Sequence, residues 1–177
     1  MARPYHVLNL TLLPLLRARI RRIEGREHLP SEGGFIIVAN HQSWIDSGII
    51  GGALYRSIRK SLRFIAQTGK YHFLGGIPIA EYERRRVLEV TLGYLRAGHP
   101  AVIFPEGNSN PEPALRPGRT GAARLALMSG LPVVPVGVFP KHEELPEDRH
   151  LLYTVTGQIM VAISQLCGKP YSQQPEG

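Results

Sequence analysis

The chain has 177 residues, of which 43% are hydrophobic and 20% are charged, a composition that excludes a largely disordered protein and suits one globular domain. Its formal net charge of +7 favours an anionic partner, such as nucleic acid, an anionic membrane surface, an acidic carrier protein or a phosphorylated substrate. The single cysteine, Cys167, excludes an internal disulfide framework and a cysteine-based metal site, and it fits a reducing compartment.

The first element, over residues 1–23, is an apolar stretch followed by clustered arginines. The apolar part is interrupted by Asn9, Thr11 and Pro14, so it falls short of the about 20 apolar residues of a transmembrane helix. Because the charge follows the apolar part, the segment is also a poor signal peptide. We predict a short helix that lies in a membrane interface; the alternative is a terminal helix docked on the domain. The arginines are Arg17, Arg19, Arg21 and Arg22.

The next elements are a buried strand over residues 35–39 and a helix that runs from Ser43 to about Tyr55. The strand is an uninterrupted apolar run after two glycines. Ser43 followed three residues later by Asp46 has the form of a capping box, which starts a helix. A basic patch follows, which we interpret as a solvated face; it comprises Arg56, Arg59, Lys60 and Arg63.

Apolar periodicity and stop signals give the remaining elements. Pro78 confines the short extended piece at residues 77–80 to an edge or an irregular strand. We predict strands at 62–66, 101–104 and 133–138, helices at 83–97 and 120–129, a loop at 108–118, a polar loop at 141–149, and a terminal hairpin from 152–155 and 159–163.

Strands that alternate with helices predict an α/β fold with a largely parallel sheet flanked by helices, and the terminal hairpin would add an antiparallel edge. We expect a single domain over residues 24–168 and a disordered tail over residues 169–177.

The first candidate site residues are His41, directly after the strand at 35–39, and Asp46. On a regular helix the two would lie roughly 140° apart, but with His41 in the non-helical lead-in the carboxylate can swing back to the imidazole. A carboxylate on one ring nitrogen leaves the other free as a base. The alternative is that Asp46 only caps the helix.

The second pair is Glu106 and Gly107, directly after the strand at 101–104. Because parallel strands end at the same edge of a sheet, we expect this pair to share a cleft with His41. The chain carries no phosphate-binding loop, no nucleophile-elbow serine motif and no histidine pair at metal-ligand spacing. The basic residues are not interleaved with the aromatics that nucleic-acid stacking needs, so we expect no nucleic-acid partner.

Four segments in order resemble the motifs of the 1-acylglycerol-3-phosphate acyltransferases and related glycerolipid acyltransferases. The segment at residues 40–46, Asn-His-Gln-Ser-Trp-Ile-Asp, resembles that family's N-H-x-S-x-x-D block. Residues 75–79, Gly-Gly-Ile-Pro-Ile, resemble its second block, and residues 104–107, Phe-Pro-Glu-Gly, resemble its third. Residues 131–136, Leu-Pro-Val-Val-Pro-Val, resemble its V-P-x-x-P-V block.

The resemblance implies transfer of a fatty acyl group from acyl-coenzyme A or acyl carrier protein to a lysophosphatidate hydroxyl, with no metal or other cofactor. It makes His41 the general base and Asp46 the residue that orients it. Glu106 and Gly107 carry over as acceptor-binding residues, and the first block adds Asn40 and Ser43 to the substrate site. We expect a peripheral protein on the cytoplasmic face of the cell membrane.

Two departures affect the phosphate side of the site. Asn108 and Ser109 stand where the family has Thr and Arg, and Ala80 and Glu81 stand where it has an acid and Arg. Other guanidinium groups suit a phosphate equally well, and we expect Arg84 and Arg119 to substitute among five nearby arginines: Arg84, Arg85, Arg86, Arg116 and Arg119.

Two alternatives stay open, and the missing arginines favour the first of them. One is the same chemistry on another lysolipid or a lipid-like alcohol. The other is a non-catalytic protein that binds a membrane or an acidic partner.

Overall fold

Short strands alternate with helices in a computed structural model that describes residues 14–18, 20–54, 56–58, 60–66, 75–79, 84–112 and 114–139. The elements begin and end within a few residues of the predicted ranges. In chain order they are η1 (Arg26–His28), β1 (Ile36–Ala39), α2 (Asp46–Leu54), β2 (Arg63–Ala66), β3 (Gly76–Pro78), α3 (Arg84–Arg96), β4 (Ala101–Ile103), α4 (Gly121–Ser129) and β5 (Val133–Val136).

The five strands form one sheet in the order β3-β2-β4-β1-β5. Every pairing among them is parallel, with Ile36 of β1 opposite Ala101 of β4 on one side and Val133 of β5 on the other. The predicted parallel α/β sheet is therefore confirmed. The hairpin at 152–163, which would add the antiparallel edge, lies outside the described residues.

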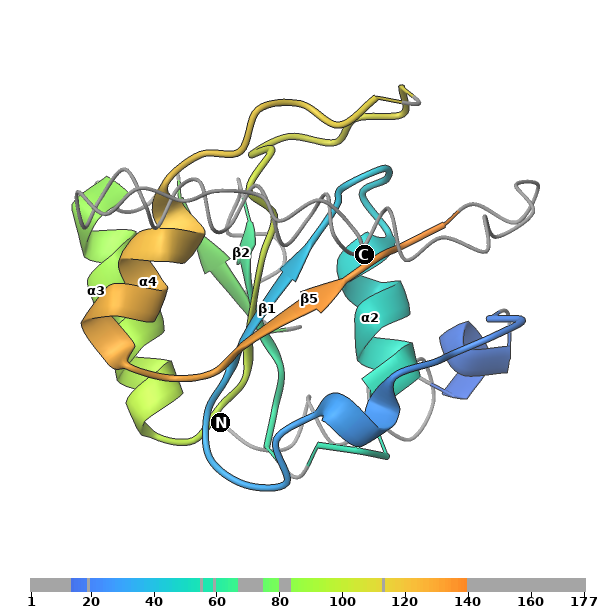
Figure 1. Cartoon of the computed structure of the whole chain (residues 1–177), viewed down its shortest axis with the longest axis horizontal. Helices are drawn as coiled ribbons and strands as arrows, with labels where there is room; N and C mark the ends of the chain where they lie inside the picture. The colour runs from blue at the N-terminus through green and yellow to red at the C-terminus, as the bar shows by residue number, and fades with distance from the viewer. Residues whose placement is uncertain are drawn as a thin grey trace, which may run out of the picture.

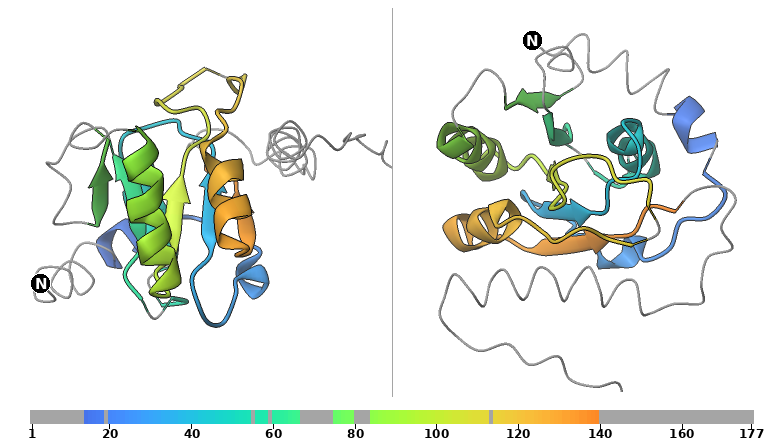
Figure 2. Two further views of the ribbon diagram at one scale, coloured as in Figure 1. Left: turned by 90° about the vertical axis from the view of Figure 1, so that its left-hand side faces the viewer. Right: turned by 90° about the horizontal axis from the view of Figure 1, so that it is seen from above.

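Helices cover both faces of the sheet (Figures 1 and 2). Helices α3 and α4 lie side by side on one face, and α2 lies on the other. This three-layer arrangement explains why β1 is an uninterrupted apolar run, since a strand buried on both faces has no solvent side on which to place polar residues.

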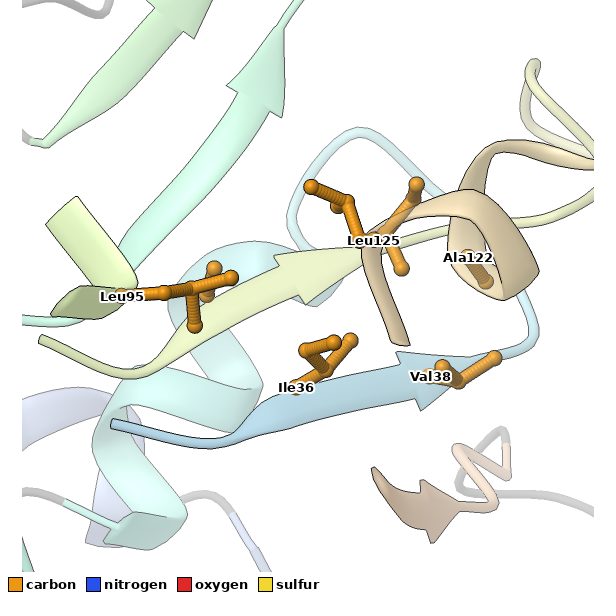
Figure 3. Close-up of a cluster of buried hydrophobic side chains, with 7 residues drawn as sticks. Ile36, Val38, Leu95, Ala122 and Leu125 are labelled. Carbon is orange, nitrogen blue, oxygen red and sulfur yellow. The ribbon is translucent and has the colours of Figure 1, made fainter. Parts of the chain in front are cut away.

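Alternate residues of β1 belong to two separate cores, as the period of two in a strand requires. Ile36 and Val38 pack with Leu95 of α3 and Leu125 of α4 (Figure 3). On the opposite face, Phe35, Ile37 and Ala39 pack in a cluster that includes Ile50 and Leu54 of α2. The two cores fix β1 in the sheet and so fix the point at which the chain leaves it.

Two prolines and a glycine occupy the positions that their chemistry allows. Pro78 lies in β3 and Pro135 in β5, the two outermost strands of the described sheet. Edge strands tolerate proline because the missing N–H can face away from the ladder. Gly130 ends α4 in the left-handed region at φ 66°, and its N–H donates to the carbonyl of Ala126 at 2.9 Å, as a helix C-cap commonly does.

Part of the predicted basic patch is packed and not only solvated. The guanidinium carbon of Arg63, the first residue of β2, lies 4.3 Å from the ring centroid of Tyr94 in α3. Tyr94 in turn meets the ring of His99 edge to face, with centroids 5.8 Å apart. The interpretation as a solvated face is therefore wrong at Arg63. Its guanidinium packs on the Tyr94 ring because a cation is attracted to an aromatic face.

Residues 14–18 of the N-terminal segment are helical. The rest of the apolar stretch before them, the polar loop at 141–149 and the tail at 169–177 lie outside the described residues. Within the described ranges, no helix combines the length and the apolar character that crossing a bilayer requires.

Candidate active site

The chain segments that follow β1 and β4 meet at one end of the sheet, the upper end in Figure 1. β1 and β4 are parallel neighbours, with Val38 opposite Ile103. His41 and Glu106 follow these strands, and the backbone N–H of His41 donates to Oε1 of Glu106 at 3.0 Å. The structure thus brings the two predicted pairs to one edge, as parallel strands require.

Asp46 turns back to His41 at the start of α2. Oδ2 of Asp46 lies 3.0 Å from Nδ1 of His41, and the same oxygen accepts the backbone N–H of Ser43 at 2.8 Å. The N–H of Asp46 donates to the Ser43 carbonyl at 3.0 Å. The bond from the Ser43 N–H to the Asp46 side chain is one half of a capping box. The helix cap and the His41–Asp46 pair therefore use the same carboxylate.

Burial and stacking hold this pair in place. The side chain of Asp46 is 4% exposed and that of His41 is 18% exposed. The ring of Phe104 stacks on the imidazole, with centroids 4.1 Å apart and planes at 18°. A carboxylate accepts hydrogen bonds, so in a neutral imidazole this contact favours the tautomer with the proton on Nδ1 and the lone pair on Nε2.

Glu106 and Gly107 differ in what they contact. The Glu106 carboxylate is buried, and its two oxygens accept hydrogen bonds from within the chain. Gly107 lines the cleft in the left-handed region at φ 81°. A Cβ at this position would lie 2.8 Å from Nε and Cζ of Arg119, so Gly107 lets the backbone approach this guanidinium closely.

Asn40 joins two strand ends. Its Nδ2 donates to the carbonyl of Val138 at 2.8 Å, and its Oδ1 accepts the N–H of Val138 at 2.7 Å. The side chain thereby continues the β1–β5 ladder past the end of β5, and its predicted contact with substrate stays a prediction.

The structure describes the side chain of one of the two predicted phosphate-binding arginines. Arg119 lines the same cleft as His41. Arg84 is the first residue of α3, and its side chain lies outside what the structure describes. The structure therefore places Arg119 at the described cleft, and the predicted role of Arg84 stays a prediction.

An open cleft of about 1720 Å³ lies over His41. Its lining is mainly apolar, and three of its residues are strongly exposed at 77%, 53% and 47%: Trp44, Leu127 and Met128. A long apolar ligand fits such a lining better than a small polar one. Apolar side chains come from the helical residues 14–18, from β2, α3, β4 and α4, and from loops between elements: Leu16, Trp44, Ile45, Phe64, Ile65, Ile79, Val87, Leu88, Ile103, Phe104, Leu127 and Met128.

Sequence reasoning missed three residues of this site. Phe104 closes a predicted strand, but its stacking on a ring 63 residues earlier has no local signal. Arg124 lines the cleft from α4; helical spacing from Thr120 to Leu127 places it on that face and is a signal that could have found it. Asn110 is 2% exposed in the loop after β4, and nothing in its neighbours marks it. Among the described residues, no group of three or more His, Cys, Asp or Glu side chains is placed to hold a metal ion.

Comparisons with known proteins agree on one family. The family model described as Acyltransferase matches residues 20–139. The chain is 28% identical over 137 residues to a chloroplastic 1-acyl-sn-glycerol-3-phosphate acyltransferase of Brassica napus, which is 70% of this chain and 38% of that protein. It is 25% identical over 147 residues to the human 1-acyl-sn-glycerol-3-phosphate acyltransferase alpha, covering 74% and 52%. The corresponding Escherichia coli enzyme is 29% identical over 128 residues, covering 66% and 52%.

The chain spans about half the length or less of these curated relatives. Among solved structures, the 1-acyl-sn-glycerophosphate (LPA) acyltransferase PlsC from Thermotoga maritima superimposes with a TM-score of 0.54 at 21% identity. That match covers 94% of this chain and 84% of the other, and it shows a shared fold.

Proposed function

Since this chain belongs to the Acyltransferase family, we propose that it transfers a fatty acyl group from an acyl thioester to the free hydroxyl of lysophosphatidate. The observation that carries the proposal is the His41–Asp46 pair, 3.0 Å apart, at a large apolar cleft. The names of the similar proteins support lysophosphatidate as the acceptor. Acyl-coenzyme A and acyl carrier protein are the two donor classes that present such a thioester.

The proposed chemistry needs one base and no covalent enzyme intermediate. Nε2 of His41 takes the proton of the acceptor hydroxyl while its oxygen attacks the thioester carbonyl carbon. The tetrahedral intermediate collapses, the carbon–sulfur bond breaks, and the leaving thiolate takes the proton back from the imidazolium. Asp46 holds the ring by Nδ1 and stabilises the imidazolium while it carries the proton.

Two arginines in the cleft support an acceptor with a phosphate. Arg119 and Arg124 both line the cavity that His41 lines. A guanidinium group binds phosphate oxygens through a planar fork of N–H donors. We propose that these two replace the family arginines that are absent at Ala80–Glu81 and Asn108–Ser109.

Exposed apolar side chains at the cleft support a membrane surface as the source of the acceptor. Leu15, 66% exposed, adjoins Leu16 of the cleft lining, and Trp44 is 77% exposed in that lining. Apolar and aromatic side chains beside cationic ones favour an anionic membrane interface. We propose that the protein works peripherally, on the cytoplasmic face of the membrane.

A second acceptor class has its own support. Asn108 and Ser109, both uncharged, line the cleft where the family places Thr and Arg. An acceptor without a terminal phosphate, such as another lysolipid or a lipid-like alcohol, would not need that arginine.

The test is release of free thiol from acyl-coenzyme A, and from acyl carrier protein, with a panel of lysolipids. The parent protein is compared with His41→Ala and with the matched control His28→Ala, which changes a histidine whose side chain is 78% exposed. We expect lysophosphatidate to be the best acceptor and His41→Ala to be slower by about 10² to 10⁴-fold, the usual contribution of a general base.

Equal rates for the parent and His41→Ala would exclude the mechanism. Preference for an acceptor without a phosphomonoester would select the second acceptor class. Binding to lipid vesicles with no turnover on any acceptor would favour a non-catalytic binding protein.

A further inference from the structure

The backbone of His41 is held on both sides by the loop that follows β4. Its N–H donates to Oε1 of Glu106 at 3.0 Å, and its carbonyl accepts the backbone N–H of Asn110. Neither bond belongs to the sheet, because β1 ends at Ala39. The segment that carries the imidazole is therefore fixed by residues more than 60 positions later.

Glu106 uses both carboxylate oxygens for this purpose. While Oε1 accepts from His41, Oε2 accepts from Nδ2 of Asn110 at 2.7 Å and from the N–H of Arg116 at 3.1 Å. The residue is 6% exposed. A buried carboxylate with three donors around it is already satisfied, so Glu106 has little capacity left for an acceptor hydroxyl.

Asn110 is engaged as completely as Glu106. Its Nδ2 also donates to the carbonyl of Ala114 at 2.8 Å, and its Oδ1 accepts the N–H of Glu112 at 3.3 Å. The side chain is buried, at 2% exposure for the residue. Both donors and the acceptor of this amide are thus used to shape the loop around Glu106.

We propose that Glu106 and Asn110 form a backbone clamp, a pair of positioning residues that set where His41 presents Nε2, and that neither touches the acceptor. The proposal rests on the proposed function and gives Glu106 a different role from the acceptor contact that the family resemblance implies. Other residues of the same loop, Gly107, Asn108 and Ser109, line the cleft. The loop would therefore have two roles: its buried residues hold the backbone of His41, and its cleft residues contact the ligand.

If Glu106 and Asn110 position His41, loosening them should change the reaction rate by an amount that kinetics can detect. Proton transfer requires hydrogen-bond reach, and a misplacement of about 1 Å can cost about 10²-fold in rate. Phe104 and Asp46 hold the ring, but the ring moves with its backbone. Loosening the clamp should therefore lower kcat without weakening the binding of the acceptor.

The test uses two isosteric variants, Glu106→Gln and Asn110→Asp, and the matched control Glu112→Gln. In Glu106→Gln, the new NH₂ must face either the His41 N–H or the two donors at the other oxygen. In Asn110→Asp, two carboxylates face each other where Nδ2 met Oε2. Glu112 is an exposed carboxylate of the same loop, so its variant removes one charge and leaves the clamp intact.

Two readouts are measured on the full chain. The first is kcat and the KM for lysophosphatidate; we expect kcat to fall by about 10 to 10²-fold in both clamp variants, with KM unchanged. The second is hydrogen exchange of the His41 backbone amide by NMR, without substrate. We expect it to be slow in the parent and in Glu112→Gln, and faster in both clamp variants.

Opposite results would overturn the clamp. A rise in the acceptor KM at unchanged kcat in Glu106→Gln would mean that Glu106 binds the acceptor directly. His41 amide exchange equal to that of the parent in Glu106→Gln would mean that the carboxylate does not hold this backbone. If Asn110→Asp does not fold, Glu106→Gln decides alone. Because the exchange readout needs no turnover, failure of the proposed function is recognised separately, by a parent protein that acylates no acceptor.

Discussion

The rings of His41 and Phe104 lie nearly parallel, with centroids 4.1 Å apart and planes inclined by 18°. Phe104 follows β4 directly, so a side chain from one strand end supports the face of a ring from another. Stacking fixes the plane of the imidazole, and the Asp46 carboxylate fixes its rotation within that plane. Together they leave Nε2 as the ring nitrogen for the cleft.

Two substitutions at Asp46 should separate charge from orientation. The oxygen that binds Nδ1 of His41 is the same one that accepts the Ser43 N–H, so the amide oxygen of Asp46→Asn can keep both bonds without the charge. We expect its kcat to fall by about 10 to 10²-fold, the worth of a charge-assisted hydrogen bond. Asp46→Ala should approach the rate of His41→Ala in the thiol-release assay. Equal kcat values for Asp46→Asn and the parent would contradict this.

Arg119 should recognise the phosphate of the acceptor. We expect Arg119→Gln to raise the KM for lysophosphatidate by about 10-fold or more, the worth of a hydrogen bond to a charged group, and to leave unchanged the KM for a lysolipid without a phosphomonoester. The control is Arg116→Gln, which makes the same change at an exposed residue outside the cleft lining. An equal effect of both variants on both acceptors would point to the overall charge of the protein instead.

Two glycines predict opposite effects of alanine on stability. A Cβ on Gly34, just before β1, would lie 2.2 Å from the carbonyl oxygen of Leu95 in α3. Backbone atoms on both sides leave little room to adjust, so we expect Gly34→Ala to lower the free energy of unfolding by about 1–3 kcal/mol or more. Gly93 lies within α3 with nothing within 4 Å of its Cβ position. We expect Gly93→Ala to raise the free energy of unfolding by about 0.5–1 kcal/mol. Urea denaturation of both variants measures the two changes, and equal changes in the free energy of unfolding would contradict the prediction.

His99 should make the stability depend on pH below neutrality. Burial lowers the pKa of His99 from its usual 6.5, against a hydrogen bond with the Ser61 carbonyl that raises it; Arg63 and Lys60 lower it further. Between the lowered pKa and 6.5 the unfolded chain binds more protons than the folded one, so the free energy of unfolding rises with pH across that range.

The matching variant is His99→Asn, because its Nδ2 can replace Nδ1 towards Ser61 and does not titrate. We expect the parent to lose more stability than this variant when urea denaturation is repeated below about pH 6.5. Parallel stability curves for the two proteins would show that His99 does not contribute.

Trp44 provides a built-in probe of the proposed membrane surface. It is the only tryptophan of the chain and is 77% exposed, so intrinsic fluorescence reports on this one side chain. We expect a blue shift when vesicles that contain anionic phospholipid are added, because the indole favours the headgroup region. Trp44→Ser should weaken co-sedimentation with the same vesicles. An unchanged emission from protein that co-sediments would place the contact elsewhere.

Local patterns in the sequence were enough to predict the layers of the fold and one side of the site. The run at 35–39 is continuously apolar and the segment at 83–97 has clear helical spacing, and parallel pairing alone brings His41 and Glu106 to one edge. Pro78 predicted an edge or irregular strand for a chemical reason that holds in three dimensions, since β3 is an outermost strand of the described sheet.

What sequence reasoning missed depends on contacts between distant residues. Asn110 looks like one more polar residue in a loop rich in proline and asparagine, and its importance arises only when it meets Glu106 and His41. The bonds of the Asn40 side chain to the backbone of Val138 were not predicted either. A side chain that bonds to distant backbone leaves no periodic trace in the sequence.

The pairing of β1 also has a consequence for how the protein is made. Its partners in the sheet come late in the chain, since Ile36 pairs with Ala101, 65 residues on (101 − 36), and with Val133, 97 residues on (133 − 36). During synthesis the apolar strand β1 therefore emerges before its partners and waits unpaired, and such a strand is prone to aggregate until its neighbours appear. The segment around His41 has its support only once these later strands exist, so nascent chains that stop before β4 and β5 should depend on chaperones and should lack the proposed acyl-transfer activity.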